Sequence, residues 1–318
     1  MKFVASAISI IILLIIINGS AQQSENIDTK QVKEKIKVVA SFYPFYEIAK
    51  EIGGNNTLVI SVIPMAVEPH DWEITPQKIH DITEADMIIY NEIGFDSWLG
   101  KKEEFRNSFL VDISKNLQLI KLGKQQESEN VRHDGQIYDQ TSRYDPHIWL
   151  DPILVKNISK TISNALIKLD PDNTDSYLQN TENFNQQLDT LDSLIKKSLA
   201  NCELKDFVTF HDSFHYFANR YGLTQHAVHG LSPEGEILPQ QIIKTISLAK
   251  DLGIDTIYSE ELKDPRLSQT LASEIPNGKV LLLSPIEGIE SQEQKKDIDF
   301  IDKMEMNLKN LKQGLKCK

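Results

Sequence analysis

One long amphipathic run in the middle of the chain limits the folds that the rest can adopt. The 27 residues from Thr174 to Ala200 contain no proline or glycine, and their apolar side chains recur at helical spacing. The expected apolar face consists of Tyr177, Phe184, Leu188, Leu191, Leu194, Ile195 and Leu199. At 1.5 Å per residue this helix is about 40 Å long. It can therefore join two lobes as a stiff connector, which predicts only modest movement between them.

Strand and helix patterns alternate before this run, within residues 36–170. Short β-branched or apolar segments predict strands at 37–42, 57–63, 86–90 and 110–111. Helical patterns lie at 44–52, from 76 onward, at 96–104 and at 154–169. This rhythm predicts an α/β lobe with a parallel-type sheet.

The same alternation returns after the run, within residues 205–318. Strands are expected at 206–210, 224–228, 256–259 and 280–283, and helices at 214–221, 239–252, 267–274 and 301–315. The predicted fold is therefore α/β, with two lobes that each hold a parallel-type sheet flanked by helices and are joined by one long connecting helix at 174–200.

The N-terminus has the features of a targeting segment. Lys2 precedes an apolar run, and small residues spaced for a cleavage site end it within residues 1–21. We expect a signal peptide or N-terminal anchor there and a flexible tether at 22–35. The protein is thus expected outside the cytoplasm, in the periplasm or on the outer cell surface, with cleavage and anchoring left open.

Charge and cysteine content narrow the function further. The net charge of −12 argues against nucleic acid as a partner. Cys202 and Cys317 are the chain's two cysteines, and in an exported protein such a pair is compatible with a disulfide, although their spacing alone does not establish one. Residues 123–143 are polar and aperiodic, and His133 within them is interpreted as a solvated side chain.

Four residues with metal-binding side chains occupy comparable positions. His70, His211 and Glu287 each follow the end of a predicted strand, and His147 is held between two Asp-Pro steps before a helix. The carboxyl ends of parallel strands face a ligand crevice, so a metal site is expected in the cleft between the lobes. Three imidazoles and one carboxylate suit tetrahedral Zn(II).

These stretches resemble the metal-binding solute-binding proteins of the zinc/manganese ABC-transporter family (cluster A-I, ZnuA-like and adhesin-type lipoproteins). The resemblance covers the chain from about Lys37 to its end. It rests on four matching stretches, which are Glu68-Pro69-His70, residues 145–152 (Asp-Pro-His-Ile-Trp-Leu-Asp-Pro), residues 210–217 (Phe-His-Asp-Ser-Phe-His-Tyr-Phe) and residues 284–288 (Ser-Pro-Ile-Glu-Gly).

The resemblance implies a binding protein that captures Zn(II) and hands it to a membrane permease. It places metal ligands at His70, His147 and His211. Histidine at the third of these positions favours zinc over Mn(II), because manganese binders of the family tend to carry glutamate there. The fourth ligand is often an aspartate near the last strand; this sequence has Ser284 there, and Glu287 or water is the expected substitute. The protein is expected to be a monomer and not an enzyme.

Other readings and residues remain open from sequence alone. A zinc-dependent hydrolase would need an open coordination position and a general base, and a surface adhesin with a structural metal would share the fold. His215 lies one helical turn after His211 and is expected to support the site rather than bind metal. Either Glu68 or Asp71 could orient His70.

Overall fold

The computed structural model describes residues 34–94, 96, 99, 102–122, 144–233 and 237–318. The elements given below lie in one unit, Lys35–Lys318. The expected signal segment 1–21, most of the tether and His133 fall outside the described residues. Among the helices of the described part, none is long and apolar enough to cross a membrane.

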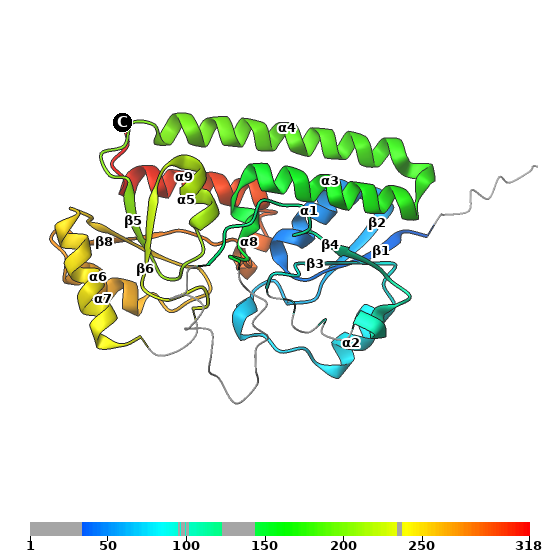
Figure 1. Cartoon of the computed structure of the whole chain (residues 1–318), viewed down its shortest axis with the longest axis horizontal. Helices are drawn as coiled ribbons and strands as arrows, with labels where there is room; N and C mark the ends of the chain where they lie inside the picture. Colours follow the sequence, from blue (N-terminus) through cyan, green and yellow to red (C-terminus); the bar gives the residue numbers. More distant parts are fainter. Residues whose placement is uncertain (1–33, 95, 97–98, 100–101, 123–143, 234–236) are drawn as a thin grey trace, which may run out of the picture. The chain divides into compact units, whose positions relative to one another are not determined.

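Two series of strands and helices build the two lobes (Figure 1). The first consists of β1 (Ile36–Ala40), α1 (Tyr43–Gly53), η1 (Gly54–Asn56), β2 (Thr57–Ser61), η2 (Pro69–Asp71), α2 (Pro76–Thr83), β3 (Met87–Tyr90), η4 (Lys102–Phe105), β4 (Phe109–Asp112), η5 (Ile148–Leu150), α3 (Pro152–Leu169) and η6 (Pro171–Asn173). After α4 (Thr174–Leu199), the second consists of β5 (Asp206–Thr209), α5 (His215–Tyr221), β6 (Thr224–Ala227), α6 (Pro239–Asp251), β7 (Thr256–Ser259), α7 (Arg266–Ser273), β8 (Lys279–Leu282), α8 (Ser291–Gln294) and α9 (Phe300–Gly314).

Each lobe has one parallel sheet of four strands, in the orders β2-β1-β3-β4 and β6-β5-β7-β8. The two orders are equivalent, since in each sheet the first strand pairs with the second and third strands of its own series. The central strands β1 and β3 are apolar and largely buried, as expected for a sheet covered on both faces. The predicted α/β class with two parallel sheets is confirmed.

The long helix α4 packs against elements of both lobes. It contacts α1 and α3 of the first lobe and α5 and α9 of the second, and Figure 1 shows it running alongside α3 and α9. Its buried apolar face holds Tyr177, Phe184, Leu188, Leu191, Ile195 and Leu199. The prediction for Leu194 was wrong: it lies one position off this stripe and is 41% exposed, because a residue next to Ile195 is turned about 100° away on a helix.

Two other local expectations are decided by the structure. In the region 96–104 only residues 96, 99 and 102–104 are described; Leu99 and residues 102–104 are in 3-10 conformation, so the predicted α-helix is wrong for the part that is described. Cys202 and Cys317 form a disulfide that fastens the segment after α4 to the segment after α9. This answers the question that their spacing had left open.

Candidate metal centre

Four side chains from four separate segments converge at one point. One nitrogen each from His70, His147 and His211 and one oxygen from Glu287 all lie within 4.8 Å of one another. His147, His211 and Glu287 are buried, and His70 is partly exposed at the edge of the group. The structure therefore brings together all four residues that the sequence singled out.

The spacing of these atoms matches a tetrahedral ion. Oε1 of Glu287 lies 3.5 Å from Nε2 of His70, 3.2 Å from Nε2 of His147 and 3.3 Å from Nε2 of His211. Bonds of 2.0–2.1 Å to a central zinc would place the ligand atoms about 3.3–3.4 Å apart. The three oxygen–nitrogen distances thus match three of the six edges of a tetrahedral zinc site, and the nitrogens lie within 4.8 Å of one another.

The carboxyl-end edges of the sheets deliver these ligands. His70 lies in η2, beyond β2, where the carboxylate of Glu68 caps the turn and accepts from the backbone N–H of His70 at 3.4 Å. His211 lies two residues past β5, and Glu287 follows β8. His147 caps η5, directly before α3. Parallel strands end at one edge, which is why ligands far apart in the chain meet.

Two buried carboxylates orient two of the imidazoles. Asp145 Oδ1 lies 2.7 Å from Nδ1 of His147 and accepts from its backbone N–H at 2.9 Å. Glu260 Oε1 lies 2.7 Å from Nδ1 of His211 and accepts from its backbone N–H at 3.2 Å. An ionised carboxylate can only accept, so each Nδ1 carries the proton and each Nε2 is directed at the centre.

The sequence analysis missed Glu260 altogether, and it did not predict that Asp145 orients His147. Glu260 comes directly after β7, which pairs with β5 in the second sheet, so it lies at the same sheet edge as His211. An acidic residue immediately after a predicted strand was the available signal. The pairing of β5 with β7, which the sequence did not supply, was needed to connect it to His211.

The charges at the centre shift the pKa values of its residues in opposite directions. Burial lowers the pKa of His211, but Glu260 and Glu287 outweigh it and hold that pKa well above its usual value. Burial is likewise outweighed at His147, mainly by Asp145, and the pKa is raised. Burial raises the pKa of Glu287, but the imidazoles, first His211, bring it well below the usual value. The carboxylate of Glu287 therefore stays ionised and is available to bind a cation together with the imidazoles.

Burial dominates at the outer edge of the centre. It lowers the pKa of His70, which leaves this imidazole neutral and able to bind metal. Burial and the charge of Glu287 raise the pKa of Glu68 to about 8, although Lys263 lies 3.5 Å from its carboxylate. Glu68 or Asp71 was predicted to orient the His70 ring through its second nitrogen; Glu68 instead contacts the backbone N–H of His70, and the Asp71 side chain lies outside the described residues.

Glu287 is placed by an unusual turn. Ile286 has φ of +58° although it is β-branched and fully buried, a conformation that is unfavourable by about 1–2 kcal/mol for such residues. The hydroxyl of Ser284 accepts from the Ile286 N–H at 3.0 Å, and Asn307 of α9 bonds both the N–H and the carbonyl of Ser284, at 2.8 and 2.7 Å. Ser284 therefore supports the turn that carries the carboxylate.

The same turn is fastened to the first lobe. Trp149 donates its indole N–H to the Pro285 carbonyl at 2.7 Å, and the N–H of Ile289 donates to the Met65 carbonyl at 2.8 Å. A Cβ on Gly288 would lie 2.6 Å from that carbonyl oxygen of Met65, so only glycine permits this close approach. Contacts from both lobes thus surround Glu287.

The remaining described histidines have other partners. His215 lies 2.8 Å from Asp145 and 3.1 Å from Asp212, in agreement with its expected supporting position. His226 pairs with Asp206, and the ring of His229 packs against that of Phe210 at 5.0 Å between centroids. His80 is exposed on α2.

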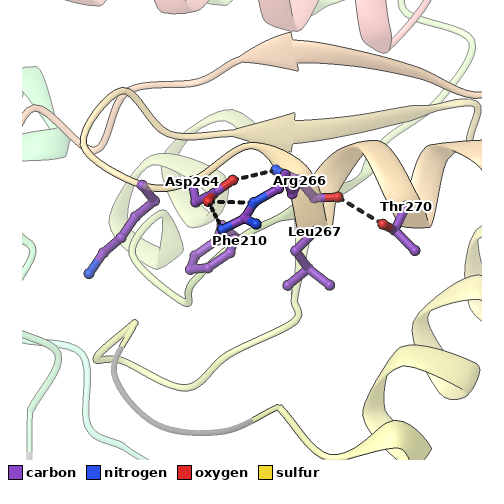
Figure 2. Close-up of a pocket in the computed structure, with 6 residues that line it drawn as sticks. Phe210, Asp264, Arg266, Leu267 and Thr270 are labelled. Carbon is purple, nitrogen blue, oxygen red and sulfur yellow. Dashed lines mark hydrogen bonds and ion pairs between the residues drawn. The ribbon is translucent and has the colours of Figure 1, made fainter.

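A cavity of about 460 Å³ lies on the second lobe and is lined in part by Phe210, the residue before His211 (Figure 2). Its polar residues largely bond each other. Arg266 donates to Asp264 at 2.6 Å, and the Thr270 hydroxyl donates to the Arg266 carbonyl at 2.8 Å. The cavity is also lined by Lys263, whose ammonium lies 3.5 Å from the carboxylate of Glu68, and by Phe210 and Leu267. It lacks the convergent donor atoms of the four-residue centre, which remains the candidate functional site.

Comparison with known proteins places the chain among metal-binding proteins. The family model for zinc-uptake complex component A, periplasmic (ZnuA), matches residues 38–314. The high-affinity zinc uptake system protein ZnuA of Bacillus subtilis is 35% identical over 309 residues, which cover 96% of this chain and 95% of the relative.

Solved structures show the same fold. Zn(II)-bound AdcA of Streptococcus pneumoniae is 28% identical with a TM-score of 0.75, over 89% of this chain and 58% of that one. The laminin-binding protein Lmb of Streptococcus agalactiae, described as a bifunctional protein with adhesin and metal transporting activity, is 28% identical with a TM-score of 0.76, over 89% of this chain and 100% of that one. This chain thus spans little more than half the length of AdcA.

Proposed function

Because this chain belongs to the family of zinc-uptake complex component A, we propose that it is the extracytoplasmic zinc-binding component of an ABC importer. It captures Zn(II) between its two lobes and delivers the ion to a membrane permease. The observation that carries this proposal is the convergence of three Nε2 atoms on one carboxylate oxygen at 3.2–3.5 Å. The proposed ligands are His70, His147, His211 and Glu287.

The donor set favours zinc over manganese. Three imidazole nitrogens and one carboxylate oxygen in tetrahedral arrangement are typical of Zn(II), whereas Mn(II) prefers octahedral oxygen ligands. The carboxylates behind His147 and His211 strengthen these nitrogens as ligands. We therefore expect Mn(II) to bind more weakly than Zn(II).

A hydrolase is the less favoured alternative. A catalytic zinc keeps one position open for water and needs space for a substrate. Glu287 occupies the fourth position in the proposed site. The space beside it, bordered by Glu68 and Glu260, is about 10 Å³, which is about the volume needed for one water molecule. A closed carrier site fits these dimensions, and we propose that the protein is not an enzyme.

The same proposal covers location and organisation. We propose that residues 1–21 are a signal peptide or N-terminal anchor, that residues 22–35 are a flexible tether, and that the protein is a monomer. Its lobes span 36–170 and 205–318, with 174–200 as the connecting helix. Adhesin activity is described for Lmb, and the metal-binding function proposed for this chain does not require it.

Calorimetric titration of the metal-free mature protein with Zn(II) and Mn(II) tests the proposal. We expect tight one-to-one zinc binding, weaker manganese binding, and a large loss of zinc affinity in Glu287→Ala. The matched control is Glu305→Ala, which removes an exposed glutamate from α9 and should bind as the unaltered protein does. No zinc binding by the unaltered protein would refute the carrier function. Unchanged binding in Glu287→Ala would mean that water or another group completes the site.

A further inference from the structure

His215 has both ring nitrogens placed against carboxylates. Nδ1 lies 2.8 Å from Oδ2 of Asp145, and Nε2 lies 3.1 Å from Oδ1 of Asp212. The first contact is a hydrogen bond and the second an ion pair, and two neighbouring carboxylates both favour the charged form of an imidazole. The arrangement is that of an imidazolium between two carboxylates.

This imidazolium connects the two lobes. His215 is the first residue of α5 in the second lobe, whereas Asp145 precedes η5 and α3 in the first. The next residue of α5, Tyr216, donates its hydroxyl to the Asp145 carbonyl at 2.8 Å and accepts from the Ile120 N–H at 3.1 Å. The start of α5 therefore holds both the side chain and the backbone of Asp145.

Asp145 in turn holds the proposed ligand His147 in position. Its Oδ2 faces His215, and its Oδ1 accepts from both Nδ1 and the backbone N–H of His147. Asp145 is fully buried, so its two oxygens have fixed partners on opposite sides. Rotation of this carboxylate would turn the His147 ring away from the centre.

We propose that His215 is a positioning residue for the metal, acting as a charged bridge from the second lobe that fixes Asp145 and, through it, His147. The inference rests on the proposed function, since it takes His147 as a zinc ligand. His215 does not bind the metal itself, because both of its nitrogens are directed at carboxylates. Its contribution is to keep His147 in place and so to slow zinc dissociation.

The electrostatic surroundings agree with this role. Burial lowers the pKa of His215, but the hydrogen bond to Asp145 and the charges of Asp212 and Asp145 outweigh burial and the opposing charge of His147, so the pKa is raised. The bridge is therefore charged over a wider pH range than an ordinary histidine.

His226 supplies a matched control in the same lobe. It pairs with Asp206 at 2.8 Å, and its side chain is 26% exposed against 28% for His215. This pair joins β5 and β6 and involves neither Asp145 nor a proposed ligand. Removal of either imidazole deletes a contact of 2.8 Å with a carboxylate, but only that of His215 is connected to the centre.

The test is the rate of zinc dissociation from the loaded full-length protein, followed by stopped-flow mixing with excess chromophoric chelator. Loss of a residue that orients a metal ligand typically costs 10–100-fold in affinity. We expect His215→Ala to release zinc at least about tenfold faster, and His226→Ala to release it at the rate of the unaltered protein. His215→Asn can place its amide N–H near the position of Nδ1, so it retains a donor toward Asp145 without the charge and should restore part of the slow release.

Three outcomes would overturn the inference. These are unchanged release in His215→Ala, equally fast release in His226→Ala, or no rescue by His215→Asn while the melting temperature of the metal-free His215→Ala protein falls. The last result would indicate a purely structural role. Failure of the unaltered protein to bind zinc would instead refute the proposed function, which keeps the two failures distinct.

Discussion

Replacement of Glu260 by glutamine offers a sharp test of how the site is tuned. Glu260 accepts from Nδ1 of His211 at 2.7 Å and from its backbone N–H at 3.2 Å. Glutamine has nearly the same shape and its amide oxygen can accept both bonds. The substitution therefore removes the charge behind His211 while it preserves the geometry.

The expected loss of zinc affinity follows from that change in charge. A hydrogen bond to an ionised group contributes about 1.5–3 kcal/mol, and a neutral one about 0.5–1.5 kcal/mol. The difference of roughly 1–1.5 kcal/mol corresponds to about tenfold weaker binding. We expect the full effect at high pH, where His211 is neutral in both proteins.

The effect should shrink as the pH falls. Glu260 is a main reason that the pKa of His211 is raised, since its charge outweighs the burial that lowers that pKa. Zinc binds only the deprotonated nitrogen, so below the pKa of His211 it must displace a proton. In Glu260→Gln that pKa is lower, and proton competition begins at a lower pH. The unaltered protein therefore loses affinity first, and the two affinities converge in acid.

Competitive zinc titrations against a chromophoric chelator between pH 6 and pH 8.5 measure this difference directly. The reasoning predicts that the ratio of the two affinities rises with pH toward about ten. A ratio that is constant with pH, or largest in acid, would refute the proposed coupling between Glu260 and the protonation of His211. Circular dichroism of both metal-free proteins verifies that the fold is retained.

Three further changes have defined outcomes. Trp149→Phe leaves the buried Pro285 carbonyl without its 2.7 Å donor and should lower the free energy of unfolding by about 1–3 kcal/mol, measured by urea denaturation; an unchanged midpoint would contradict the role given to this bond. Joint replacement of Cys202 and Cys317 by serine opens a loop of 115 residues and should cost up to about 4–5 kcal/mol in the chain-entropy model; calorimetry that finds no fall in melting temperature would argue against it. Free zinc at 100 times the dissociation constant of the unaltered protein should stabilise that protein by about 2.7 kcal/mol, and a chelator should reverse this. Stabilisation of equal size in Glu287→Ala at the same zinc concentration would speak against that residue as a ligand.

The sequence predicted the fold because its signals are local. Prolines and a capping threonine mark helix starts: Thr75 accepts from the Lys78 N–H, and Pro76 begins α2. Apolar runs with abrupt polar ends mark the strands. Two parallel sheets and a connecting helix follow from that order, and the structure agrees. The prediction failed at Leu194, which was assigned to the buried face of α4 although it lies beside that face, next to Ile195.

The supporting parts of the site could be predicted only in part. Asp145 and His147 are two residues apart in a distinctive stretch, so their relation is local. Glu260 and His211 meet through strand pairing, which a single sequence does not specify. The conformation of Ile286 is imposed by Ser284 and α9 around it, and no feature of an isoleucine indicates a positive φ.

The packing of α4 on both lobes has a consequence for the timing of metal transfer. A helix that contacts α1 and α3 at one end and α5 and α9 at the other leaves no hinge along its length. If the four proposed residues bind zinc, thermal motion has few ways to separate them at once, and the proposed function then predicts slow spontaneous release of the ion. The residence time of zinc on such a carrier would then be set by the permease, which would have to move the segments that hold the four ligands. The rate of uptake would depend on this encounter at the membrane and not on spontaneous release by the carrier.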